Sequence, residues 1–112
     1  METKITFRNM ESSPTIEKYV NEKVAKLDRL LSKEREPKKL EIILEAERIH
    51  QQHAVELRLH CADYHERAQT SGKDIYALID NVFSVLIKGI NKKKGKRLDA
   101  RKEPDPYREP LE

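Results

Sequence analysis

The sequence contains few of the residues on which disulfide-bonded, membrane-spanning or base-stacking proteins depend. Its single cysteine, Cys61, excludes an internal disulfide and agrees with a reducing compartment. Tryptophan is absent, and aromatic residues make up 5% of the chain. The longest apolar run, residues 82–87, is interrupted by Ser84 and falls far short of the roughly 18 residues that cross a bilayer. We therefore expect no membrane-spanning segment.

Length and composition favour one small cytoplasmic domain. A chain of 112 residues has room for a single core, and with 38% of its residues charged that core must be thin. The first 14 residues, METKITFRNMESSP, have no apolar segment of the kind found in secretory signals. The expected location is therefore the cytoplasm.

Basic charge is concentrated near the C-terminus. Residues 88–102 contain eight lysines and arginines and one acid, Asp99, for a net charge of +7, whereas the whole chain carries only +3. Such a segment is typical of proteins that bind a polyanion, because each neutralised phosphate releases condensed counterions. Taken alone, the charges are equally compatible with a solvated helix face.

The N-terminal third predicts a strand followed by a helix. Residues 4–8 alternate polar with apolar side chains, so Ile5 and Phe7 should point inward from a strand. Ser13 is placed to cap a helix that has Pro14 at its first position. The apolar stripe of this helix recurs at spacings of three and four: Ile16, Val20, Val24, Leu27 and Leu31, widened by Tyr19 and Leu30.

Three strands are expected next. Residues 40–47 and 55–62 alternate clearly, and a weaker strand is expected over 66–70, with Ala68 and Thr70 inward, ending at Gly72. The inward residues of the two clear strands are Leu40, Ile42, Leu44 and Ala46 in the first, and Val55, Leu57, Leu59 and Cys61 in the second.

A second helix and a tail complete the chain. Asp74 should cap a helix that runs to about Lys94, in which Gly89 costs roughly 1 kcal/mol relative to alanine, so that its last turns depend on a partner for order. Residues 98–112 contain three prolines among charges and little apolar material, which predicts a flexible tail. We therefore expect one domain over residues 1–97.

The order β-α-β-β-β-α predicts an α+β fold. One four-stranded sheet should be covered on a single face by two amphipathic helices. The right-handed crossover rule makes the first two strands parallel if they are neighbours, and the remaining strands should form an antiparallel meander.

Basic residues lie on the polar faces of both expected helices. We expect this helical side, and not the open face of the sheet, to contact nucleic acid. The open sheet face is acidic, with four glutamates partly offset by Arg58: Glu41, Glu45, Glu47 and Glu56. Since no aromatic platform is expected on the sheet, recognition should depend on phosphates and shape. The candidates are Lys18, Lys23, Lys26 and Arg29 on the first helix, and Lys88, Lys92, Lys93, Lys94, Lys96 and Arg97 on the second.

Metal binding and catalysis are not indicated. His60 and Cys61 are adjacent on a strand and point to opposite faces, and His50 and His53 lack a matching second pair. The sequence has neither a phosphate-binding glycine loop nor a recognisable nucleophile beside a base. We expect no metal, no cofactor and no enzymatic activity.

Two segments form a pattern that resembles a known family. The first is YVNEKVAKLD at residues 19–28, and the second opens with DIYALID at residues 74–80 and closes with KKKGK at residues 92–96. Together, over about residues 3–97, they are similar to the ribosome hibernation promoting factors, also called ribosome-associated inhibitors or sigma-54 modulation proteins. Because the sequence ends soon after the basic segment, we expect a short form without the further domain of long forms.

The resemblance implies a function as well as a fold. It implies a double-stranded-RNA-binding-like domain that lodges in the small ribosomal subunit near the decoding centre, without a small-molecule substrate, and occludes the mRNA and tRNA sites during stress or stationary phase. Lys23, Lys26, Lys88, Lys92, Lys94 and Lys96 fall on family positions that face rRNA. Lys18, Arg29, Lys93 and Arg97 come from the helical-face argument alone.

The chain also departs from the family pattern, and two other functions are compatible with its residues. Val85 stands where a lysine is usual and Gly89 where glutamine is common, so we expect docking contacts at these two positions to differ from those of the family. The first alternative is a general double-stranded-RNA-binding module. The second is a protein-interaction adaptor whose basic tract binds an acidic protein.

Overall fold

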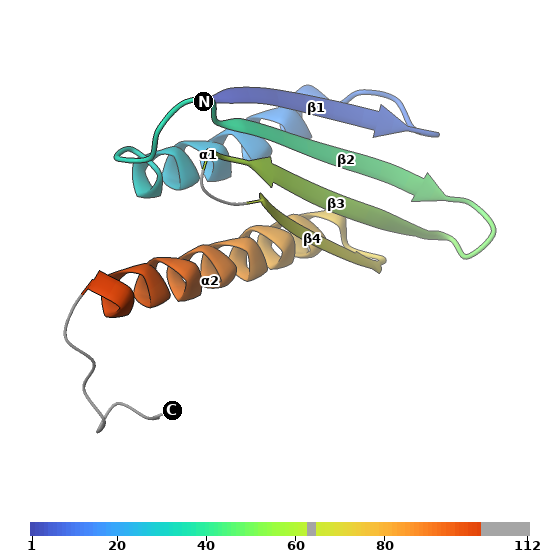
Figure 1. Ribbon diagram of the computed structural model, residues 1–112. Helices are drawn as coiled ribbons and strands as arrows, with labels where there is room; N and C mark the ends of the chain where they lie inside the picture. Colours follow the sequence, from blue (N-terminus) through green and yellow to red (C-terminus); the bar gives the residue numbers. More distant parts are fainter. Residues whose placement is uncertain (63–64, 102–112) are drawn as a thin grey trace.

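Six elements make up the computed structural model, which describes residues 1–62 and 65–101, with side chains described as far as Gly95. In chain order (Figure 1) they are β1 (Glu2–Arg8), α1 (Pro14–Leu30), β2 (Lys39–Glu47), β3 (Gln52–His60), β4 (His65–Gly72) and α2 (Ile75–Arg101). The predicted β-α-β-β-β-α order and the α+β fold class are confirmed.

The sheet has the strand order β1-β2-β3-β4. Helix α1 carries the chain from β1 back to a parallel β2, with Ile5 opposite Ile42, as the crossover rule predicts. The next two pairings are antiparallel: Leu57 of β3 lies opposite Ile42 on one side and Ala68 of β4 on the other. The parallel pair and the antiparallel meander were therefore both predicted correctly.

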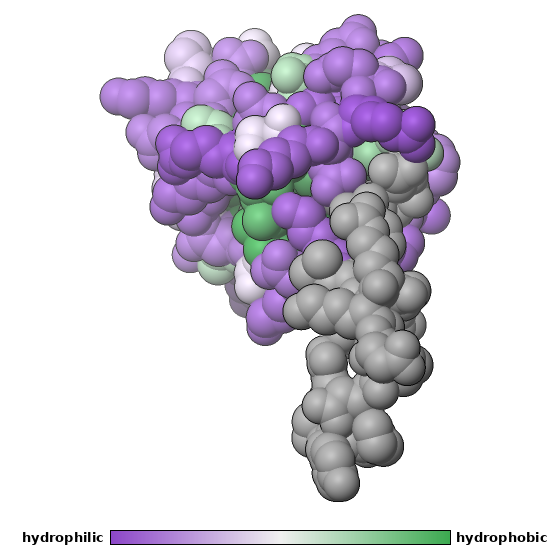
Figure 2. Space-filling view, turned by 60° about the vertical axis from the view of Figure 1, so that its left-hand side comes forward, coloured by the Kyte–Doolittle hydropathy of each residue, from purple (hydrophilic) through white to green (hydrophobic). Residues whose placement is uncertain are grey.

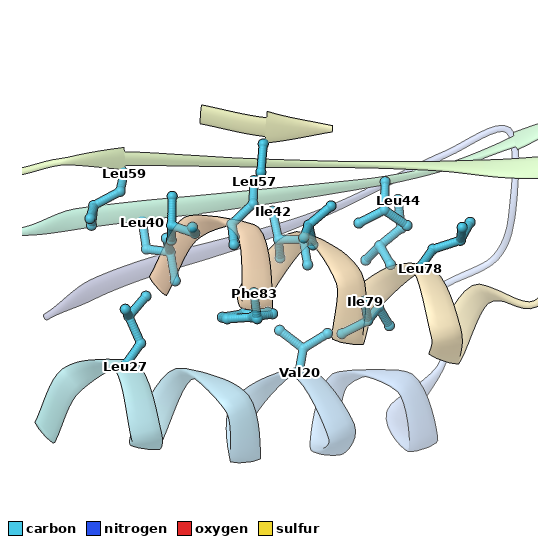
Figure 3. Close-up of a cluster of buried hydrophobic side chains, with 14 of the residues drawn as sticks. Val20, Leu27, Leu40, Ile42, Leu44, Leu57, Leu59, Leu78, Ile79 and Phe83 are labelled. Carbon is cyan, nitrogen blue, oxygen red and sulfur yellow. The ribbon is translucent and has the colours of Figure 1, made fainter. Parts of the chain in front are cut away.

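Both helices cover one face of the sheet and form the core with it. Figure 3 shows Val20 and Leu27 of α1 and Phe83 of α2 facing the inward side chains of the central strands, among them Leu57. Val20, Leu27 and Leu57 are fully buried, and Phe83 is 2% exposed. The helical and strand periodicities read from the sequence thus mark the buried surface.

The ends of α1 are satisfied by specific contacts. The Ser13 hydroxyl accepts a hydrogen bond from the Ile16 backbone N–H at 3.2 Å, which confirms the expected cap. At the other end, two lysines donate to the last carbonyl groups. Lys38 Nζ lies 3.1 Å from the Leu31 oxygen, and Lys94 Nζ lies 2.9 Å from the Leu30 oxygen. Lys38 is buried by this contact.

Several element boundaries differ from those predicted. Strand β3 begins at Gln52, earlier than expected, and ends at His60, although Cys61 is still buried. Strand β4 is longer than residues 66–70, although it does end at Gly72. These differences arise because backbone pairing continues past the residues whose side chains alternate: the β3–β4 ladder extends from His53–Gly72 to His60–His65.

The second helix continues past the predicted end. It runs to Arg101, so the prediction that it stops at about Lys94 was wrong, and the expected tail from residue 98 begins inside the helix. The Lys94 bond to the end of α1 ties this part of α2 to the domain. The rest of the expected tail, residues 102–112, lies outside the described residues. Among those described, no helix is long and apolar enough to cross a membrane.

Candidate nucleic-acid interface

One group of predicted binding residues presents unpaired positive charge to solvent. All five members of this group are exposed and, within the described part of the chain, their side chains form no ion pair or hydrogen bond. They are Lys18, Lys26 and Arg29 on α1 and Lys88 and Lys92 on α2. We call these five residues the unpaired basic group. Their charges are available to a polyanion because, among the described residues, no ion pair or hydrogen bond engages these side chains.

Lys23 is engaged at the junction of the two helices. Its Nζ lies 3.0 Å from Asp80 Oδ1 of α2 and 5.4 Å from the centre of the Tyr19 ring. The Tyr19 hydroxyl donates to the same Asp80 oxygen at 2.6 Å. The Tyr76 and Tyr19 rings form a perpendicular, T-shaped pair with centroids 5.1 Å apart. We call Tyr19, Lys23, Tyr76 and Asp80 the junction cluster.

The electrostatics of the junction cluster follow from these contacts. The hydrogen bond from Tyr19 and the ammonium group of Lys23 stabilise the charged carboxylate, so the pKa of Asp80 is lowered. The same hydrogen bond raises the pKa of Tyr19, because the neutral hydroxyl is the donor. Lys26 also lowers the pKa of Asp80 through its charge. A carboxylate therefore stays ionised amid the lysines.

Lys93 and Lys94 are also engaged within the protein. Lys93 Nζ lies 2.6 Å from Glu66 Oε2 of β4 and 3.5 Å from the His65 carbonyl oxygen. Lys94 Nζ is bonded to the Leu30 carbonyl oxygen at the end of α1. These two side chains hold α2 against β4 and against the end of α1, and their positive charge is partly neutralised by these contacts. Lys96 and Arg97 belong to α2, but their side chains lie outside the described residues.

The open sheet face is less acidic than its glutamates suggest. Arg58 lies 2.9 Å from Glu56 and 3.7 Å from Glu41, and Arg67 of β4 forms a second ion pair with Glu56. The hydrogen bond from Arg58 is the largest cause of the lowered pKa of Glu56. The sequence analysis assigned the offset to Arg58 alone and missed Arg67, because the register that brings it to Glu56 depends on β4.

Aromatic rings are scarce on that face. Among the described residues of the four strands, the outward positions carry no phenylalanine, tyrosine or tryptophan, and the ring pair there is His60 with His65, whose Nδ1 atoms are 2.7 Å apart. The described residues also contain no group of three or more His, Cys, Asp or Glu side chains that could hold a metal ion. Base stacking on the sheet is therefore not supported by what is described of it.

The molecular surface agrees with a polar interface. Figure 2 shows a face that is mostly hydrophilic, with a hydrophobic area near its centre and smaller, paler hydrophobic spots scattered elsewhere. The large apolar side chains that are exposed are isolated from one another in the fold: Ile49 in the β2–β3 turn, and Tyr76 and Val85 on α2. Charge and shape, and not a broad apolar patch, characterise this surface.

Sequence reasoning missed the junction cluster as a unit. It predicted Asp74 as the cap of the second helix, and Asp74 does accept a hydrogen bond from the Tyr76 backbone N–H at 3.1 Å. The partner of Asp80 is Tyr19, 61 residues away. No local signal predicts that contact, since it exists only when the two helices lie side by side.

Comparison with known proteins places the chain in a family. The model of the family described as sigma 54 modulation protein / S30EA ribosomal protein matches residues 3–98. The N-terminal domain of Protein Y from Thermus thermophilus superposes with a TM-score of 0.69 at 23% identity, covering 82% of this chain and 98% of that one. A ribosomal subunit interface protein from Coxiella burnetii superposes with a TM-score of 0.72 at 17% identity, and the match covers 85% of this chain and 99% of that one.

No curated protein sequence matches the chain. The two structural likenesses therefore bear on the fold, which they share over nearly their whole length. The family match extends from β1 to the last turns of α2 and includes both basic helices. The chain belongs to the sigma-54 modulation protein and S30EA ribosomal protein family, whose members are ribosome-associated factors.

Proposed function

We propose that this protein is a ribosome hibernation factor that binds the small ribosomal subunit near the decoding centre and occludes the mRNA and tRNA sites. It acts by binding, without catalysis, in the cytoplasm. The observation that carries the proposal is the unpaired basic group, which lies on the two helices of a chain that belongs to a ribosome-associated family.

The helical face suits the backbone of structured RNA. Phosphate contacts supply most of the affinity of such complexes and fix their orientation. Lys88 and Lys92 are four residues apart and therefore share one side of α2. Exposed lysines without an internal partner can bind a phosphate at little cost in free energy, because no existing ion pair has to break.

The length of α2 supports an inhibitory mode of binding. With 27 residues it measures about 40 Å, longer than any strand of the sheet. Figure 1 shows its last turns extending past the end of the sheet. A rigid basic rod of this kind can follow an RNA groove while the sheet fills the adjoining space, so that a second RNA cannot enter.

Cosedimentation with ribosomal subunits at several salt concentrations tests the proposal, with in-vitro translation followed in the same samples. We expect salt-sensitive binding to the small subunit and a proportional loss of translation. The variant Lys88→Glu, Lys92→Glu, Lys96→Glu should lose binding and keep its melting temperature. The matched control is Lys4→Glu, Lys39→Glu, Lys73→Glu, which makes the same charge change on exposed residues outside the helices.

Two outcomes would reject the proposal in favour of an alternative. Equal binding to double-stranded RNA and to small subunits, with no effect on translation, would identify a general double-stranded-RNA-binding module. Failure to bind either RNA at low salt, together with nuclease-resistant complexes from cell extract, would identify a protein-interaction adaptor. Intact ribosome binding by the folded helical variant would exclude the helical face as the docking surface.

A further inference from the structure

The junction cluster has a feature that helix packing does not require. The Tyr76 side chain is 38% exposed among charged neighbours, and within the described residues its hydroxyl has no hydrogen-bond partner. Its ring lies perpendicular to the Tyr19 ring, at an interplanar angle of 90°, and this contact restricts the orientation of the Tyr76 ring. The cluster therefore presents a rigid aromatic surface to solvent.

Asp80 offers an unused acceptor beside that ring. It follows Tyr76 by four residues on α2, so both side chains lie on the same side of the helix. Asp80 Oδ1 receives the Tyr19 hydroxyl and the Lys23 ammonium group, whereas Oδ2 has no partner among the described residues. The Asp80 side chain is 50% exposed.

A carboxylate on a phosphate-binding face repels phosphate. It suits a different part of RNA, namely the N–H donors on the Watson–Crick edge of an unpaired base. Aromatic side chains bind such bases by stacking, since every base has a π-face. An exposed tyrosine next to an ionised aspartate therefore combines the two contacts by which proteins recognise a base that has left its helix.

We propose that Tyr76 and Asp80 form a recognition site for one unpaired nucleobase, which stacks on the Tyr76 ring and donates to Asp80 Oδ2. The inference rests on the proposed function, because it assigns a specific contact within the RNA-binding face. Tyr19 and Lys23 are positioning residues that hold the ring and the carboxylate. Lys26, whose charge reaches Asp80, is placed to meet a flanking phosphate.

Guanine is the base that this site favours. Its Watson–Crick edge presents two adjacent donors, N1–H and N2–H, that can both be directed at Asp80 Oδ2. Uracil presents one donor between two carbonyl oxygens, which the Asp80 charge repels. Cytosine and adenine each present one amino donor beside an acceptor and should bind with intermediate affinity.

Titration of the full-length, isotopically labelled protein with GMP and with UMP, followed by amide chemical shifts, tests the site directly. The wild-type protein should bind GMP about fivefold or more tightly than UMP, with shifts centred on Tyr76 and Asp80. Shifts of equal size for both nucleotides, or shifts confined to the unpaired basic group, would overturn the inference, because a phosphate alone would then account for binding.

Three variants separate stacking from charge. Tyr76→Ala should weaken GMP binding about fivefold or more, whereas Tyr76→Phe, which keeps the ring, should bind GMP as the wild type does. Asp80→Asn should still bind nucleotides and lose the preference for GMP. Undiminished GMP binding by a folded Tyr76→Ala protein, or an unchanged preference in Asp80→Asn, would refute the site.

A parallel measurement on small ribosomal subunits distinguishes this inference from the proposed function. If the wild type binds subunits and Tyr76→Ala binds them equally well, the base site is wrong and the proposed function stands. If the wild type fails to bind subunits while GMP selectivity is present, the proposed function is wrong and the base site stands. Weaker subunit binding by Tyr76→Ala, with Tyr76→Phe unaffected, supports both.

Discussion

Tyr19 and Asp80 join the two helices by a hydrogen bond of 2.6 Å between the tyrosine hydroxyl and the Asp80 Oδ1 atom. The bond connects residues that are 61 positions apart and is reinforced by Lys23 at 3.0 Å from the same oxygen. It orients one carboxylate within a basic surface. It also makes part of the stability of the α1–α2 pair dependent on the ionisation of Asp80.

The first prediction is a pH dependence that originates at Asp80. The Tyr19 hydrogen bond and Lys23 lower its folded-state pKa below the unfolded value of about 4, so the unfolded chain binds the proton more tightly. The stabilisation is complete above about pH 5 and is lost as pH falls through 4 and below. Replacing Asp80 with Asn should therefore cost about 1 kcal/mol at neutral pH, a modest value because the group is half exposed.

Urea unfolding of the wild type and of Asp80→Asn across this pH range measures the effect. The difference in free energy of unfolding between the two proteins should shrink on acidification. A difference that stays constant or grows at low pH would contradict the assignment.

The second prediction concerns the core. Leu57, at the centre of β3, is fully buried between neighbouring strands and helices. Replacing it with alanine should lower the free energy of unfolding by about 2–5 kcal/mol, because the cavity that remains cannot fully collapse. Val85→Ala is the matched control: Val85 is 48% exposed on α2, and its truncation should change stability by no more than about 0.5 kcal/mol. Denaturant titration of both variants provides the comparison.

The third prediction concerns Gly89. Alanine has a helix propensity about 1 kcal/mol better than glycine, but a Cβ at position 89 would lie 2.8 Å from Glu66 Oε1. The Glu66 carboxylate, which is paired with Lys93, would have to move. Gly89→Ala should therefore stabilise the protein by clearly less than the propensity difference.

A double-mutant cycle with Glu66→Ala tests this reasoning. In the Glu66→Ala background the Gly89→Ala substitution should show its full propensity gain, because the obstructing carboxylate is gone. Equal effects of Gly89→Ala in both backgrounds would exclude the proposed conflict between Cβ and carboxylate.

The fourth prediction separates the unpaired lysines from those engaged within the protein. Lys88→Ala with Lys92→Ala should reduce the salt slope of RNA binding by about two units and leave stability nearly unchanged. Lys93→Ala with Lys94→Ala removes the same charge but breaks contacts to Glu66 and to the Leu30 carbonyl, so it should lower the melting temperature and change the slope less. Identical slopes for the two pairs would show that internal pairing does not determine which lysines bind RNA.

Much of the fold could be predicted because its elements have strong periodicity. Stripes such as Ile16, Val20 and Leu27, and alternations such as Leu40, Ile42 and Leu44, mark buried faces without reference to the rest of the chain. The end of α2 could not be predicted, since the sequence beyond Ile90 has no apolar repeat. One contact that stabilises this part of α2 is the hydrogen bond from Lys94 Nζ to the Leu30 carbonyl oxygen of α1.

The candidate site was predictable as a set of basic helix residues but not in its internal pairing. Periodicity showed which side of each helix is polar. It could not show that Lys93 meets Glu66, because that pair depends on how α2 crosses β4, or that Lys23 meets Asp80. Partners distant in the sequence decide which of the equivalent-looking lysines keep a free charge.

The two lysines at the end of α1 have a consequence for how RNA can approach. A helix ends in carbonyl groups that carry about half a negative charge, and a bare end of this kind would push a phosphate backbone away. Lys38 and Lys94 place their ammonium groups on the Leu31 and Leu30 oxygens, and Lys38 also pairs with Glu36 at 3.5 Å. The partial negative charge of this helix end is thereby compensated, so a polyanion following α2 is repelled less where it passes α1.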